Sequence, residues 1–275
     1  MISKKKKTAM HVGTILITLM IVFPFIWMIL LSFKTNSEIM TAPLALPSSL
    51  NFENYKNAFK VLNYVQLYGN TFFVCIISIV IELTITFLSS FVLARMEFSG
   101  RIKSLLYGFL ILGLSISPFI LLFPVYKINV FFKLSGKLGL IFPYVATSIS
   151  FNTLLLVGYL KTLPAEIDEA AVMDGCSVWQ LMLKVILPMT KPVIATVVIF
   201  NVLYIWNEYP FASVMLRDAA DYTLSMGASF FKGTYTVDYG GIIASSIMII
   251  IPELIFYGLF QKNIVEGMTA GAVKG

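Results

Sequence analysis

The amino-acid sequence predicts an all-α polytopic membrane protein with six transmembrane helices. Of the 275 residues, 58% are hydrophobic and only 12% are charged, which is far from the balance of a water-soluble domain. The apolar residues gather in continuous stretches of roughly 20, the length that crosses a hydrocarbon core of about 30 Å as a helix. A transmembrane β-barrel would instead show short segments of alternating apolar and polar residues.

The six predicted spans share a high content of Ile, Leu, Val, Phe and Met. They cover residues 10–32, 70–93, 104–126, 139–160, 190–209 and 241–261. The loops between them are too short for a second domain, so residues 1–275 are expected to form one membrane domain. Prolines interrupt several spans, and Pro118 and Pro124, which lie in one span, are the best candidates for a hinge.

The basic residues predict the orientation. Lys4 to Lys7 form a cluster before the first span, and such a cluster is typical of a cytoplasmic segment that faces anionic lipid. A cytoplasmic N-terminus followed by six spans places the C-terminus in the cytoplasm as well, with twelve of the twenty Lys and Arg residues on that side. The other basic residues are scattered and no recognition module is visible, so no nucleic-acid partner is expected.

The sequence offers no metal centre and no nucleotide site. His11 is the only histidine, and Cys75 and Cys176 lie on elements that the topology keeps apart, so neither a metal site nor a disulfide is expected. No Gly-x-x-x-x-Gly-Lys-Ser/Thr loop occurs to hold ATP phosphates. We therefore expect no catalytic residue and no bound cofactor in this chain.

One predicted cytoplasmic loop, residues 163–188, has the pattern of two short helices. Pro164 suits a first helical position, the acids that follow it suit the positive end of the helix dipole, and Gly175 suits a left-handed turn. A second helix is expected from about Ser177 to Val185, ending before Pro188.

The first of these helices carries the residues that suit contact with a partner. Ala170 and Ala171 would give a small-side-chain surface that a partner's backbone can approach closely, and Glu169 could pair with a basic residue of that partner. On these grounds alone, a docking surface and a plain connector remain equally open.

The spacing within this loop carries a family resemblance. Glu169-Ala-Ala171, three residues, Gly175, nine residues and Val185-Ile-Leu-Pro188 resemble the EAA motif of the permease subunits of bacterial ATP-binding-cassette importers, with Val185 as a conservative departure. In that family the helix with the motif sits in a cleft of a cytoplasmic ATPase and transmits its closure. The docking residues that the resemblance implies are Glu169, Ala170, Ala171, Asp174, Gly175, Leu187 and Pro188.

The wider chain is similar to sugar permeases of the maltose type, and specifically to the six-span partner of the pair. The stretches that carry this similarity are 25–34, 51–55, 94–95 with 98–101, 206–207 and 267–275. The resemblance implies the type I importer permease fold. It also implies a complex with a second homologous permease, an extracytoplasmic sugar-binding protein and two ATPase subunits that hold ATP and Mg²⁺.

Two further regions receive roles from the same resemblance. The outer loop 210–239 is expected to meet the binding protein. The C-terminal tail is expected at the interface of the ATPases, through Gly271, Ala272, Lys274 and Gly275.

Polar residues in or near the spans are candidates for a substrate path. They are Glu82, Asn201, Glu208 and Glu253. Intramembrane carboxylates are costly and usually face a pathway or a partner. The family is expected to have apolar residues at the positions of Glu82 and Glu253, so the resemblance gives these acids no role. From their chemistry, they could bond sugar hydroxyls or another helix.

Two alternatives to a sugar importer stay open. The EAA motif is shared by many importers, so the solute need not be a sugar. A stand-alone ion-coupled carrier would use Glu82 and Glu253 as coupling carboxylates, although the absence of visible repeats argues against it.

Overall fold

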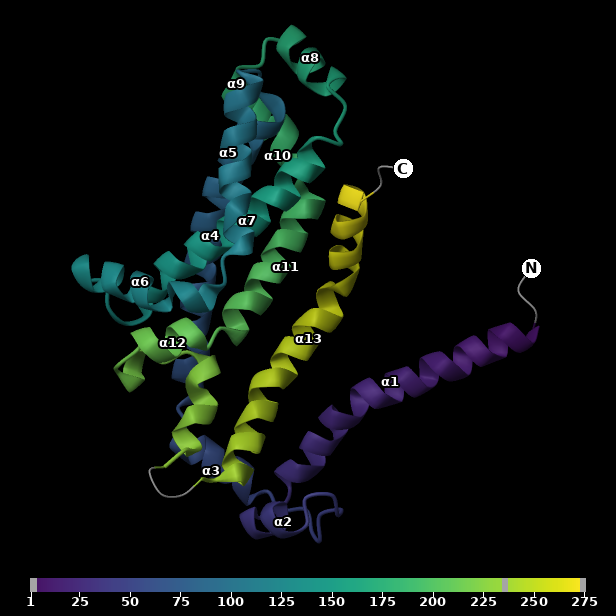
Figure 1. The fold of residues 1–275 in the computed structure, drawn as a ribbon, viewed down its shortest axis with the longest axis vertical. Helices are drawn as coiled ribbons and strands as arrows, with labels where there is room; N and C mark the ends of the chain where they lie inside the picture. Colours follow the sequence, from purple (N-terminus) through teal and green to yellow (C-terminus); the bar gives the residue numbers. More distant parts are fainter. Residues whose placement is uncertain (1–3, 234–236, 273–275) are drawn as a thin grey trace. The chain divides into compact units, whose positions relative to one another are not determined.

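The computed structural model describes the backbone of residues 4–233 and 237–272, and the side chains of residues 6–8, 10–233 and 237–262. Every regular element in this part of the chain is a helix, which confirms the all-α class (Figure 1). The elements are α1 (Lys4–Ser32), α2 (Asn36–Thr41), α3 (Glu53–Val61), α4 (Tyr64–Arg95), α5 (Gly100–Leu112), η1 (Gly113–Ser115), α6 (Pro118–Phe131), α7 (Gly136–Leu160), α8 (Glu166–Met173), α9 (Val178–Gln180), η2 (Leu181–Ile186), α10 (Leu187–Met189), α11 (Lys191–Asn207), α12 (Pro210–Met215), η3 (Ala219–Asp221), η4 (Leu224–Phe231) and α13 (Tyr239–Ala272).

Among the described residues, four helices are long and apolar enough to cross a membrane by themselves, namely α1, α4, α7 and α13. Two further pairs of helices meet the same criterion only when each pair is taken together. Residues 100–115 and 118–131 meet at a bend of 104°, and residues 178–189 and 191–207 meet at a bend of 72°. Counting each bent pair as one span gives six spans, the number that the sequence predicts.

The third predicted span, 104–126, is not one continuous helix. Ser117 has extended backbone dihedrals and Pro118 opens α6 at its first position, while Pro124 lies inside α6. A proline disfavours helical geometry in the residue before it, so the break falls directly before Pro118. The bend therefore coincides with the first of the two hinge candidates, and whether it moves stays a prediction.

The chain divides into two compact units, and the first combines the residues up to Tyr64 with Gly227–Pro252. Within this unit, Asn54 closes the end of α1. Its side-chain amide donates to the carbonyl of Ser32 at 2.7 Å and to that of Lys34 at 2.8 Å. The Lys34 ammonium in turn donates to the carbonyl of Ala42 at 2.8 Å. The last carbonyls of a helix have no partner within it, so these side chains supply the missing hydrogen bonds.

The second unit combines Val65–Met226 with the residues from Glu253 onward, and two apolar clusters hold it together. One cluster joins α4, α7 and α11 to α12, through residues such as Val74, Tyr144 and Phe211. The other joins the end of α4 to the residues around α8 and η2, through Phe91, Leu160 and Ile186 among others. Within this unit, α8 lies beyond the ends of α5 and α7 (Figure 1).

Candidate functional site

The predicted loop forms a helical hairpin of residues 163–189, here called the coupling hairpin. Its first helix, α8, ends in a left-handed glycine: Gly175 has φ +77°. The N–H of Cys176 donates to the carbonyl of Ala171, and the N–H of Gly175 donates to that of Val172. This pair of bonds is the Schellman motif, which requires positive φ at the glycine position. The corner predicted at Gly175 is therefore confirmed, whereas Pro164 lies two residues before α8 rather than at its first position.

The second arm of the hairpin is longer than the sequence predicts. Ser177 opens it with a capping box, in which Ser177 and Gln180 exchange side-chain and backbone hydrogen bonds. The arm does not end before Pro188 but continues to Met189, because residues 181–186 form a π-helix in which the N–H of Leu187 donates to the carbonyl of Met182. The wider π-turn accommodates a proline ring that would clash with the preceding turn of a regular α-helix.

Arg95, the last residue of α4, holds the coupling hairpin. Its guanidinium donates to the carbonyls of Leu160, Leu163 and Pro164 at 3.2, 2.8 and 2.9 Å. It also pairs with both carboxylate oxygens of Asp168 on α8, at 2.9 Å from Nη2 and 2.8 Å from Nε. The Arg95 side chain is only 7% exposed. A planar five-donor group suits such a multiple contact, which ties α4, the end of α7 and α8 together.

The faces of α8 differ in exposure, and this corrects one expectation. Glu169, Ala170 and Asp174 are exposed, as a docking role requires. Ala171 is only 6% exposed and belongs to the apolar cluster that joins the hairpin to α4 and to the end of α7, so it does not belong to the outer small-side-chain surface.

Exposed apolar side chains surround these polar residues, and sequence reasoning missed them. Met173 is 87% exposed and Trp179 is 65% exposed, with Val172, Val178 and Leu183 also exposed. Large apolar groups that remain in contact with solvent are typical of a surface that meets a partner. The available signal was the position of Met173 and Trp179 on either side of the glycine corner.

A second candidate site lies among α4, α7 and α11, around Glu82. This residue has no exposed surface, and neither of its carboxylate oxygens has a direct hydrogen-bond partner among the described residues. Its polar neighbours are Ser148, Asn152 and Asn201, and the Asn201 amide donates to the Asn152 carbonyl oxygen at 3.0 Å. A buried carboxyl surrounded by amides and a hydroxyl is costly to fold and typical of a functional position in a membrane protein.

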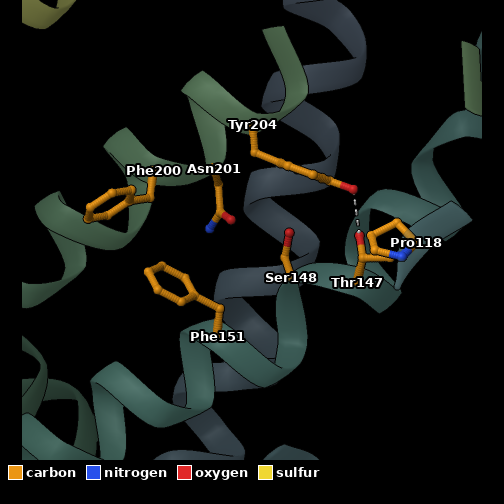
Figure 2. Close-up of a pocket in the computed structure, with 7 residues that line it drawn as sticks. All are labelled: Pro118, Thr147, Ser148, Phe151, Phe200, Asn201 and Tyr204. Carbon is orange, nitrogen blue, oxygen red and sulfur yellow. Dashed lines mark hydrogen bonds between the residues drawn. The ribbon is translucent and has the colours of Figure 1, made fainter. Parts of the chain in front are cut away.

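A cavity of about 210 Å³ opens on this polar cluster. Figure 2 shows Ser148 and Asn201 directed between the rings of Phe151, Phe200 and Tyr204. Phe151 and Phe200 pack edge to face, with ring centroids 5.3 Å apart. Two of the polar neighbours of Glu82 thus also line the cavity, which combines flat apolar walls with groups that can hydrogen-bond a hydroxyl.

The other two predicted path residues lie elsewhere. The Glu208 carboxylate accepts from the Tyr144 hydroxyl at 2.7 Å and from the N–H groups of Phe211 and Ala212 at 2.7 and 3.2 Å. These contacts cap α12, so a structural role accounts for Glu208 without a substrate. Glu253 accepts from the Asn207 amide at 2.6 Å. The structure therefore brings Asn201 to Glu82, but not Glu208 or Glu253.

The predicted tail site lies beyond what the structure describes. Lys274 and Gly275 fall outside the described residues, and only the backbone of Gly271 and Ala272 is described, as the end of α13. The role of the tail stays a prediction.

Comparison of the whole chain with known proteins shows its family. Residues 86–269 match the family described as binding-protein-dependent transport system inner membrane component, and the chain belongs to this family. It is 31% identical over 267 residues to the diacetylchitobiose uptake system permease protein NgcG of Streptomyces coelicolor, covering 96% of this chain and 88% of that protein. It is 32% identical over 280 residues to the trehalose/maltose transport system permease protein MalG of Thermococcus litoralis, covering 98% of both.

A solved structure supports the fold. The crystal structure of a bacterial ABC transporter involved in the import of the acidic polysaccharide alginate contains a chain that matches with a TM-score of 0.76, at 22% identity, over 95% of this chain and 98% of that one. This likeness confirms the permease fold. The chain is thus a membrane permease component of an ABC importer.

Proposed function

We propose that this chain carries a sugar or short oligosaccharide across the membrane, from an extracytoplasmic binding protein to the cytoplasm. The names of its relatives support this substrate class: besides the diacetylchitobiose and trehalose/maltose permeases, a multiple sugar-binding transport system permease protein of Streptococcus mutans is 32% identical over 260 residues. The cavity beside Glu82 adds aromatic walls and amide groups, which suit the apolar faces and the hydroxyls of a sugar.

The observation that carries the proposal is the coupling hairpin. Its first helix, α8, offers Glu169 and exposed apolar groups to a partner, while the ion pair of Arg95 with Asp168 joins α8 to the membrane span α4. The proposed complex contains two separate ATPase subunits, which hold ATP and Mg²⁺, and one of them binds α8. Their closure favours one state of the permease, and hydrolysis restores the other.

A second permease of the same family completes the pathway in this proposal. The cavity of about 210 Å³ is smaller than the roughly 300–1,000 Å³ that is typical of ligand pockets. A facing subunit would supply the other wall. The coupling hairpin and both termini then lie in the cytoplasm, as the lysine cluster before the first span predicts.

The test is uptake by the reconstituted complex. Proteoliposomes with ATP inside and binding protein outside are offered a panel of labelled monosaccharides and oligosaccharides. Uptake of a sugar that needs both ATP and the binding protein is the expected result. Uptake driven by a proton or sodium gradient without ATP would contradict the proposal.

A charge reversal on α8 tests the docking surface. Glu169→Lys should weaken ATPase binding and lower uptake while membrane insertion is unchanged. Glu97→Lys is the matched control, since Glu97 is an exposed acid in the loop between α4 and α5. Equal ATPase binding by the two variants would remove Glu169 from the docking surface.

A further inference from the structure

A second cavity, of about 220 Å³, lies where three membrane helices end. Its walls include Lys103, Ser104 and Tyr107 of α5 and Lys161, which directly follows α7. Leu93 near the end of α4 closes it on the third side. Because α4 and α7 end here and α5 begins here, the cavity lies at the level where the spans meet the membrane surface.

The charge in this cavity is not balanced by the chain. Neither Lys103 nor Lys161 is within ion-pair distance of a carboxylate among the described residues, and the cavity walls include no acid. The Lys161 ammonium lies 5.3 Å from the centre of the Tyr107 ring, and the Lys103 ammonium lies 5.7 Å from that of Phe98. The Lys103 ammonium also donates to the carbonyl of Met96 at 3.3 Å. Neither an aromatic ring nor a carbonyl neutralises an ammonium, so both lysines in the cavity wall carry a charge that no described carboxylate balances.

The surface of α5 beyond the cavity is apolar. Leu105, Leu106 and Phe109 are 73%, 47% and 74% exposed. A soluble anion would gain nothing from this surface, whereas the acyl chains of a lipid would cover it. The combination of a basic cavity between spans and an apolar surface next to it is the pattern that favours lipid headgroups.

We propose that this cavity binds the phosphate headgroup of an anionic lipid, with Lys103, Lys161 and the Ser104 hydroxyl as its donors. The assignment to the cytoplasmic leaflet rests on the proposed function; the site itself does not. Lys161 adjoins Leu160, whose carbonyl accepts a hydrogen bond from Arg95. The bound lipid therefore sits against the base of the coupling hairpin.

The experiment is native mass spectrometry of the full-length chain in detergent, with phosphatidylglycerol or phosphatidylcholine added. The chain should retain phosphatidylglycerol in preference to phosphatidylcholine. Lys103→Gln and Lys161→Gln should each weaken phosphatidylglycerol binding about fivefold, which is the contribution of one basic residue near an anionic surface. The control variants Lys191→Gln and Lys262→Gln each remove the same single charge from an exposed lysine and should have little effect. Lys103→Arg/Lys161→Arg should retain the lipid, which separates loss of charge from misfolding.

Three results would overturn the proposal. One is equal retention of phosphatidylglycerol by the wild type and the glutamine variants. Another is an equal loss in the control variants, which would mean that total charge alone attracts the lipid. The third is binding of inorganic phosphate at millimolar concentration without any preference for phosphatidylglycerol, which would assign the site to a soluble anion. None of these measurements needs ATPase, binding protein or sugar, so the result is independent of the transport test.

Discussion

Replacement of Arg95 by alanine should release the coupling hairpin from α4. The substitution removes the three carbonyl contacts and both contacts with Asp168. The matched variant Asp168→Asn removes only the negative charge and leaves the carbonyl contacts in place. The two variants therefore separate the ion pair from the rest of the clamp.

The magnitude follows from burial. Breaking a largely buried ion pair costs about 3–5 kcal/mol, and the low end applies here because Asp168 is 22% exposed and water can reach the freed carbonyls. We expect about 3 kcal/mol for Arg95→Ala. The charge on a partly exposed carboxylate is worth about 1 kcal/mol, which is the expected cost of Asp168→Asn. These values correspond to about 100-fold and about fivefold changes in local opening.

Hydrogen exchange of the α8 amides measures this opening directly. The purified chain is expected to show faster exchange in α8 for Arg95→Ala, a smaller increase for Asp168→Asn, and little change in α13, which makes none of these contacts. In the reconstituted complex, Arg95→Ala should lower the amount of sugar moved per ATP hydrolysed. If the two variants exchange equally fast, the ion pair alone holds the hairpin and the carbonyl clamp is not significant.

Three further predictions test other parts of the chain. Gly175→Val should reduce sugar uptake and ATPase binding because a β-branched residue is strained at φ +77°, and Gly175→Asn, scored in the same two assays, should be milder. Glu208→Ala should lower the melting temperature by about 4 °C or more, because its capping bonds, worth about 1–2 kcal/mol, are lost. Glu82→Gln should leave the melting temperature unchanged or raised but should alter the apparent KM for sugar. The reverse pattern would contradict both assignments. Hydrogen bonds from Ser48 and from the backbone of Thr35 lower the pKa of Glu38 from 4.5 to about 2. The stabilisation of α2 by the ionised Glu38 cap is therefore fully present above pH 4.5 and is lost as pH falls through about 2. Glu38→Gln should speed hydrogen exchange in α2 at pH 7 but make no difference near pH 2.

The parts of the site that were predictable depend on residues close together in the chain. The glycine corner at Gly175 and the start of the second arm at Ser177 follow from hydrogen bonds between residues at most five positions apart. The break before Pro118 also has a local cause, although the apolar run around it suggested one continuous helix. Apolar composition sets membrane insertion, but it does not report where a proline bends the span.

The parts that were missed depend on pairs that are distant in the chain. Arg95 and Asp168 are 73 residues apart, and no local pattern indicates that an arginine at the end of one span reaches the loop after another. The neighbours of Glu82 come from two other helices, so the sequence could identify a costly carboxyl but not its surroundings. The inward direction of Ala171 depends on how the two arms of the hairpin pack.

The two candidate sites share one continuous helix. Arg95 and Glu82 both belong to α4, thirteen residues apart, which is about 20 Å along an α-helix. No proline lies within α4, whereas α6, α7 and α13 each contain at least one, so a displacement applied at Arg95 is not absorbed by a proline kink before it reaches Glu82. Movement of α8 in the proposed complex would therefore shift Glu82 relative to Ser148 on α7 and Asn201 on α11. In the proposed complex, this arrangement would connect an ATP-driven displacement at the membrane surface with the polar cluster that faces the cavity.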